Sequence, residues 1–220
     1  MMRKRTILSV MSGAALGLCT LLFAAAAGLA LIHITDFPYV ADIGALSIPE
    51  ATGLSREVIL ANYNAVMEFL SPFSGGEFFL PDLVWSESGA FHFEECKIIF
   101  NGLYLLGAAA AVLMLAFFLF LRRKVRLPLV LSVSGCTTIA LPLAVCAAVA
   151  VDFSKAFVLF HKIFFDNDMW LFDPRLDPVI NILPAEFFMH CAVFLCAVIV
   201  LCAAAELAVS RVLFRKEVAE

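Results

Sequence analysis

Long runs of apolar residues alternate with polar segments along this chain. The runs cover residues 7–32, 98–121, 129–151 and 187–209, and Glu206 is the only formally charged residue within them. A helix of about 20 apolar residues crosses the roughly 30 Å core of a bilayer, and each run exceeds that length. Composition agrees, since 63% of the residues are hydrophobic and the mean hydropathy is +0.99. The pattern predicts an all-α membrane protein, a single integral domain over residues 1–220 with four spanning helices in one bundle.

The first apolar run also has the basic start of a secretory signal peptide. It is longer than the roughly 7–15 apolar residues of such a peptide, so we expect a retained spanning helix rather than a cleaved segment. Gly13 and Gly17 within it form a GxxxG pattern, which allows close packing against another helix.

Two polar segments, 33–97 and 152–186, separate the apolar runs and are long enough to fold. In the first, Ser55 is placed to cap a helix, and apolar residues recur at helical spacing until the chain reaches Pro72. Residues 39–48 and 77–85 are short, apolar segments that favour strands. In the second segment, Asp-Pro pairs at 173–174 and 177–178 predict extended or turn structure. We expect a small α/β cap built from both segments.

Basic residues are concentrated on one side of the predicted bundle. They precede the first run, fill the loop 122–126 and follow the fourth run, whereas both long polar segments are rich in acidic residues. The positive-inside rule places both termini in the cytoplasm and both polar segments, with the cap, outside the cell membrane. The formal net charge of −4 offers no overall basic character for binding nucleic acid.

Cysteine placement excludes two common kinds of site. All but one of the seven cysteines lie inside apolar runs, where Cys behaves as a small apolar residue. Only Cys96 lies near the outer surface, so a disulfide framework within the outer segments is excluded. No CxxC spacing typical of a zinc site is present.

All four histidines fall at the same, outer end of the apolar runs. His33 follows the first run, His92 precedes the second, His161 follows the third and His190 lies at the start of the fourth. Histidine is the side chain that titrates near neutral pH, and this end of the bundle is where lipid headgroups and ester bonds lie. Position alone does not separate a catalytic histidine from an interfacial one, and we interpret His33 and His190 as interfacial groups.

Aromatic and acidic residues crowd around His161. Residues 160–178 contain Asp168, Trp170 and Asp173 beside several phenylalanines. An aromatic belt at the membrane interface explains many of the rings, but not the carboxylates near a histidine. A carboxylate can fix the tautomer of a histidine, as in hydrolytic triads. Neither a G-x-S-x-G elbow nor an H-E-x-x-H motif occurs, so we predict neither a serine acyl-enzyme nor a metal site.

These residues resemble a known family. Residues 85–87 and 92–97, Trp-Ser-Glu and His-Phe-Glu-Glu-Cys-Lys, resemble the histidine motif before the second span of the lipoprotein intramolecular transacylases of Gram-positive bacteria. Residues 63–70 resemble a helix of that family's first outer loop, and residues 160–188 match its second outer loop. The likeness covers essentially the whole chain. Gly89, Phe93, Glu95 and Cys96 depart from the family pattern, which leaves a non-catalytic paralogue as an alternative.

The resemblance implies a reaction and a site. The substrate is a lipoprotein whose N-terminal cysteine carries a diacylglyceryl group, and the sn-2 acyl chain moves to the α-amino group of that cysteine. The two catalytic histidines of the family match His92 and His161. We assign His161 as general base and His92 as partner acid or oxyanion stabiliser, and the reverse assignment stays open. We expect Tyr63, Trp170, Asp168 and Asp173 to bind substrate, with packing or turn formation as their alternative roles. The reaction needs no metal and no cofactor, and the partners are the lipoprotein and membrane lipids.

Two other function classes stay open at this point. One is a hydrolase that acts on lipid esters of the outer leaflet and releases a free fatty acid. The other is a non-enzymatic accessory or sensor protein that responds to pH through its histidines.

Overall fold

The computed structural model describes residues 2–219, with the backbone alone for residues 2, 3 and 219. It contains helices and no strands over that range, and it divides into two compact units. The first unit comprises the chain up to Leu29, Leu105–Ala147 and the chain from Val193 onward. The second comprises Ala30–Tyr104 and Ala148–Ala192. Four long helices contribute residues to both units.

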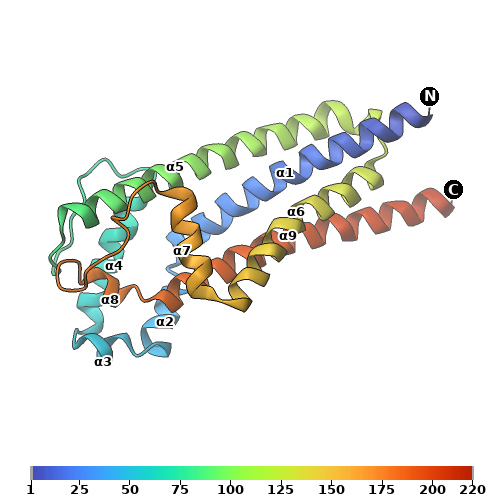
Figure 1. The fold of residues 1–220 in the computed structure, drawn as a ribbon. Coiled ribbons are helices and arrows are strands. Elements are labelled where there is room, and N and C mark those ends of the chain that lie inside the picture. Colours follow the sequence, from blue (N-terminus) through green and yellow to red (C-terminus); the bar gives the residue numbers. More distant parts are fainter. Residues whose placement is uncertain (1, 220) are drawn as a thin grey trace. The chain divides into compact units, whose positions relative to one another are not determined.

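The first unit is a bundle of four helices that run side by side (Figure 1). They are parts of α1 (Met2–Thr35), α5 (Glu87–Ala116), α6 (Leu127–Val151) and α9 (Ala185–Ala219). A π-helical turn, Phe117–Leu121, and a 3-10 turn, Arg122–Lys124, extend α5 toward α6. Each of the four predicted apolar runs lies within one of these continuous helical segments, which are long and apolar enough to cross a membrane.

Small residues bring these helices into close contact. A Cβ atom on Gly13 would lie 2.7 Å from Cβ of Val133, and one on Gly17 would lie 2.7 Å from the carbonyl oxygen of Ser134. Real side chains do not approach that closely, so the predicted GxxxG pattern is a contact surface for α6. On the other face of α6, a Cβ on Gly135 would lie 2.6 Å from Leu207 of α9.

The single charged residue of the apolar runs lies in a shell of hydroxyl groups. Glu206 of α9 accepts hydrogen bonds from Thr20 Oγ1 at 2.7 Å and Ser134 Oγ at 2.8 Å, and Thr138 Oγ1 lies 3.5 Å from its second oxygen. These donors come from α1 and α6. Polar groups in a lipid-embedded bundle must be satisfied by other protein groups, and this network joins three helices in that way.

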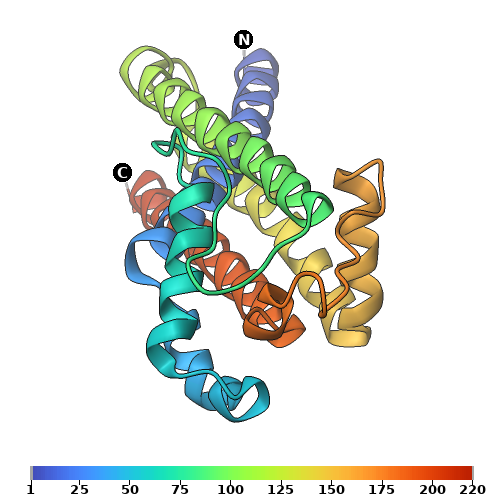
Figure 2. The ribbon, with the colours of Figure 1, turned by 90° about the vertical axis from the view of Figure 1, so that its left-hand side faces the viewer.

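The second unit holds one end of each long helix and five short helices. Figure 2 faces this unit, with α4 in teal and α7 in gold. The short helices are α2 (Tyr39–Ala45), α3 (Ile48–Thr52), α4 (Arg56–Leu70), α7 (Phe153–Phe164) and α8 (Val179–Ile182). Helix α4 is the predicted one: Ser55 Oγ accepts from the Val58 amide at 3.4 Å, and the helix ends before Pro72.

The predicted strands of the cap are wrong, because the cap is helical and irregular. Residues 39–45 form α2, whose buried side chains Tyr39, Asp42 and Ile43 follow helical spacing. In residues 77–85 burial does alternate, with Phe78 and Leu80 buried around an exposed residue 79, as in a strand. No neighbouring strand is available in the described chain to complete a ladder, and Pro81 lacks an amide donor. The fold class is therefore all-α over the described residues.

A buried carboxylate holds the beginning of α5. Asp177 accepts hydrogen bonds from the amide and the hydroxyl of Ser86, at 2.8 and 2.7 Å, and Ser86 Oγ in turn accepts from the Gly89 amide. A Cβ at position 89 would overlap the Asp177 carboxylate. Glycine at position 89 therefore has a steric reason, and the same contacts place His92 one turn further along the helix.

Candidate active site

Two buried imidazole rings face each other in the second unit. His92 comes from the first turns of α5 and His161 from the last turn of α7. The exposed fraction is 6% for His92 and 8% for His161. The ring centroids lie 5.8 Å apart with an interplanar angle of 34°. The structure thus brings together the two histidines that the sequence singled out.

The tautomer of His161 follows from its hydrogen bond. Its Nδ1 lies 2.8 Å from the carbonyl oxygen of Phe157, which can only accept, so Nδ1 carries the proton. In the neutral ring the lone pair is then on Nε2. Burial lowers the pKa of His161 from its ordinary value, and the bond to Phe157 opposes that shift. The ring is therefore neutral at pH 7 and available as a base through Nε2.

Aromatic rings enclose both histidines. His161 stacks against Trp170 at 4.6 Å between centroids and lies 4.2 Å from Phe157. Phe165 contacts both imidazoles, at 5.5 Å from His161 and 4.7 Å from His92. These rings fix the imidazole planes and limit the access of water, which strengthens electrostatic interactions inside the site.

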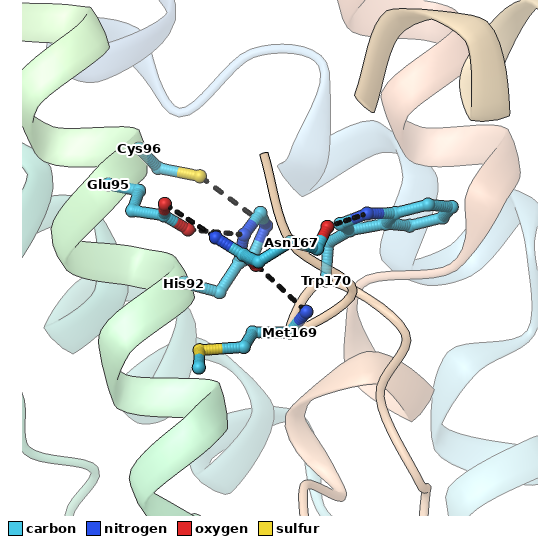
Figure 3. A network of polar contacts seen from close by, with 6 residues as sticks. All are labelled: His92, Glu95, Cys96, Asn167, Met169 and Trp170. Carbon is cyan, nitrogen blue, oxygen red and sulfur yellow. Dashed lines mark hydrogen bonds and ion pairs between the residues drawn. The ribbon is translucent and has the colours of Figure 1, made fainter. Parts of the chain in front are cut away.

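A chain of polar contacts connects the surroundings of the two histidines (Figure 3). Asn167 donates from Nδ2 to Glu95 Oε1 at 2.8 Å and accepts at Oδ1 from the Met169 amide at 2.9 Å. The carbonyl oxygen of Asn167 accepts from Trp170 Nε1 at 3.0 Å. Because Glu95 lies one turn from His92 and Trp170 stacks on His161, Asn167 couples the two sides of the site.

His92 has a different environment from His161. Its Nε2 lies 3.5 Å from the Cys96 thiol, and its Nδ1 lies 3.9 Å from Glu95 Oε2. Within the described chain, neither that Nδ1 nor that Oε2 has a hydrogen-bond partner, although both atoms are buried. A movement of less than 1 Å would join them, and the bond would be strongest for a protonated His92.

The remaining predicted substrate residues lie in different surroundings. Tyr63 is in the core of the second unit, stacked on Tyr39 with centroids 3.8 Å apart. Asp168 is exposed in the turn before Trp170. Asp173 is bound by Arg175, whose Nε and an Nη atom donate to its two oxygens at 3.0 and 2.6 Å.

The other two histidines have their own hydrogen bonds. His190 Nδ1 donates to the buried carboxylate of Asp42 at 2.8 Å, and His33 Nδ1 lies 2.9 Å from the Tyr104 hydroxyl. Both pairs belong to the second unit. His33 and Tyr104 also line a cavity of about 760 Å³ beside α4, which neither His92 nor His161 lines.

Sequence reasoning missed Asn167 and the carbonyl of Phe157. Helical spacing could have revealed Glu95 and Cys96, because positions three and four residues after His92 share its helix face. Nothing in the sequence indicates that Asn167 returns to α5 across 72 positions. Among the described residues, no group of three or more His, Cys, Asp or Glu side chains is arranged to hold a metal ion.

Comparisons with known proteins agree with this arrangement. The model of the family "lipoprotein intramolecular transacylase" matches residues 14–188. A solved structure of the membrane-integral lipoprotein intramolecular transacylase from Bacillus cereus has a TM-score of 0.89 and 29% identity, and the match covers 97% of this chain and 99% of that one.

Two variants of the same Bacillus cereus protein also match. One, with a histidine-to-arginine mutation, has a TM-score of 0.83 and 28% identity, over 98% of this chain and 96% of that one. The other, with a histidine-to-alanine mutation, has a TM-score of 0.84 and 28% identity, over 100% and 99%. A search of curated proteins gave no significant match. With four apolar helices and these relatives, the chain is a multi-pass membrane protein, and it belongs to the lipoprotein intramolecular transacylase family.

Proposed function

We propose that this protein is an acyltransferase that moves the sn-2 acyl chain of a diacylglyceryl-modified N-terminal cysteine to the α-amino group of the same cysteine. The product is an N-acyl-S-monoacylglyceryl lipoprotein. Family membership supports the reaction class. The observation that carries the mechanism is the geometry of His161, a neutral buried base whose Nε2 is free of the Phe157 bond, beside a second imidazole.

The reaction begins with a proton transfer. The α-ammonium group must lose a proton before its nitrogen can attack the ester carbonyl, and His161 Nε2 accepts that proton. The N–C bond then forms as the carbonyl oxygen becomes an oxyanion. The nitrogen, now bonded to carbon, gives up a second proton. The carbonyl re-forms as the C–O bond to the sn-2 oxygen breaks, and that oxygen takes up a proton as it leaves.

His92 is the partner in the second half of the reaction. We assign it to protonate the leaving sn-2 oxygen or to stabilise the oxyanion. Burial, and to a smaller extent the neighbouring His161, lowers the pKa of His92 to about 4, so this ring is neutral before the reaction begins. The Glu95 carboxylate, 3.9 Å from its Nδ1, is the nearby group placed to stabilise a positive charge that forms on the ring during transfer. Amine and ester belong to one molecule, so holding them close supplies much of the rate, and no metal or separate acyl donor is required.

Substrate binding is assigned to the remaining candidates. Trp170 fixes the plane of the His161 ring by stacking on it, and the rest of the indole ring contacts the glyceryl group. Asp168, exposed one turn away, is suited to attract the α-ammonium group, and Asp173 and Tyr63 shape the surrounding loop and core. We propose that the site lies at the extracellular face, with both termini in the cytoplasm, as the distribution of basic residues favours.

The proposal extends to the arrangement of the chain in the membrane. Residues 1–220 form one integral membrane domain with spans 7–32, 98–121, 129–151 and 187–209. Segments 33–97 and 152–186 form the outer cap.

The test is mass spectrometry of the N-terminal lipopeptide from a lipoprotein co-expressed with this chain, in a host that makes only diacylglyceryl lipoproteins. We expect the isobaric lyso form, with fragment ions that place one acyl group on nitrogen. His161→Phe keeps the aromatic stacking and removes the base, so it should abolish the product, whereas His190→Gln should retain it. Loss of one acyl chain without N-acylation would indicate a hydrolase. An unchanged peptide, with the protein confirmed in the membrane, would indicate an accessory protein.

A further inference from the structure

Helix α7 has an exposed apolar face that the proposed chemistry does not use. Leu159, Phe160, Ile163 and Phe164 form this apolar face and are 58%, 48%, 66% and 51% exposed. Successive residues of an α-helix are 100° apart, so these positions lie within one sector of the helix. His161 lies outside this sector and points into the unit, where its ring contacts Phe157. The helix is therefore divided between a packed side and a bare apolar side.

Basic residues border the apolar face. Lys155 and Lys162 are exposed and seven residues apart, so they lie two turns apart on nearly the same line of the helix. Lys155 contacts Asp152 at 3.0 Å, and its side chain is otherwise in solvent. Lysines beside an apolar face can extend their ammonium groups to lipid phosphates while their stems stay in apolar surroundings.

The short connection between α6 and α7 indicates which surroundings cover the apolar face. Helix α6 is one of the four segments apolar enough to cross the membrane, and it ends at Val151. Only Asp152 separates it from α7; this residue is extended, and its side chain caps the new helix at the Lys155 amide. A helix joined by one residue to the end of a spanning segment begins at the membrane surface.

We propose that α7 is an interfacial helix whose apolar face inserts into the outer leaflet, with Lys155 and Lys162 directed to anionic lipid headgroups. Amphipathic helices of this kind lie about 5–10 Å deep, at the boundary between headgroups and acyl chains. That boundary is also where the ester bonds of lipids lie. Because α7 carries His161 on its packed side, insertion sets the depth at which this histidine operates. The competing occupant of the face is a second copy of the chain.

The test uses a dansyl amino acid at position 163 or 154 of the full chain, reconstituted in phosphatidylglycerol vesicles. Ile163 lies on the apolar face, and exposed Ser154 is nine residues earlier, which places it on the opposite side of the helix. Quenching is measured with lipids that carry a nitroxide on a shallow acyl carbon, and with aqueous iodide. We expect at least threefold stronger quenching by the nitroxide lipid at 163 than at 154, and the reverse order with iodide.

Two results would overturn the proposal. Equal iodide quenching at both positions would place the apolar face in water. Protection of the 163 probe from both quenchers, together with energy transfer between labelled copies, would assign the face to a second copy of the chain. Neither readout depends on acyl transfer, so failure of this proposal is distinguishable from failure of the proposed function.

Discussion

Asn167 offers the sharpest test of how the site is held. Asn167→Ala removes the 2.8 Å hydrogen bond to Glu95 and the 2.9 Å bond from the Met169 amide, but keeps the backbone carbonyl that Trp170 uses. A hydrogen bond to a charged group contributes about 1.5–3 kcal/mol. The Glu95 side chain is 22% exposed, so solvent screening favours the lower end of that range. Since each 1.36 kcal/mol changes a rate tenfold, we expect transfer to slow by about tenfold.

The assay is the initial rate of lyso-form lipopeptide production by the purified variant, with thermal unfolding measured in parallel. Asn167→Asp keeps an acceptor for the Met169 amide but places a carboxylate against Glu95, so it should slow transfer at least as much. Exposed Asn181 provides the matched control, because Asn181→Ala leaves the site untouched. A folded Asn167→Ala variant that works within twofold of the parent rate would refute the positioning role.

Three further predictions use contrasts within the chain. Gly89→Ala should destabilise the protein by about 1–3 kcal/mol because its methyl group overlaps a buried carboxylate, whereas Gly102→Ala, which meets no atom within 4 Å, should stabilise it by about 0.5–1 kcal/mol; thermal unfolding in detergent compares them. Tyr39→Phe loses a 2.8 Å bond to a backbone carbonyl and should cost about 1 kcal/mol. Tyr63→Phe removes a buried hydroxyl without a hydrogen-bond partner in the described chain, so unfolding should show little change; reduced transfer would instead reveal substrate contact. The pKa of His161 is lowered from 6.5, so the transfer rate should fall as the pH drops through that lowered pKa. The free energy of unfolding should fall as well when the pH drops below 6.5, because the unfolded chain binds that proton more tightly.

Sequence patterns predicted the elements that depend on residues close together in the chain. Four apolar runs became four long helices because a bilayer demands that length. Helix α4 followed from Ser55 and the spacing up to Leu70. The prediction of strands was wrong because a strand requires a pairing partner, which no local pattern supplies. Helices α7 and α8 were not predicted; they lie on either side of the Asp-Pro turns, between the third and fourth apolar runs.

Some residues of the candidate site could likewise be predicted from the sequence, and others could not. Position at the ends of apolar runs marked all four histidines, and the family resemblance singled out His92 and His161, whose rings lie 5.8 Å apart in the structure. The contact between Asn167 and Glu95 could not be predicted, because it depends on the path of a loop that returns to α5. Asp177 was visible only as half of an Asp-Pro turn, whereas its carboxylate secures the beginning of α5.

The main-chain partner of His161 has a consequence for how this site can vary over evolutionary time. In many hydrolases a carboxylate side chain orients the histidine, and one mutation removes it. Here the acceptor is the carbonyl of Phe157, one turn earlier in the same helix, and no side-chain replacement at position 157 deletes that oxygen. The orientation of this proposed base therefore depends on the helix itself. A saturation mutagenesis screen would find no orienting acid for this ring, and its sensitive positions would be the aromatic neighbours and the residues that keep α7 helical.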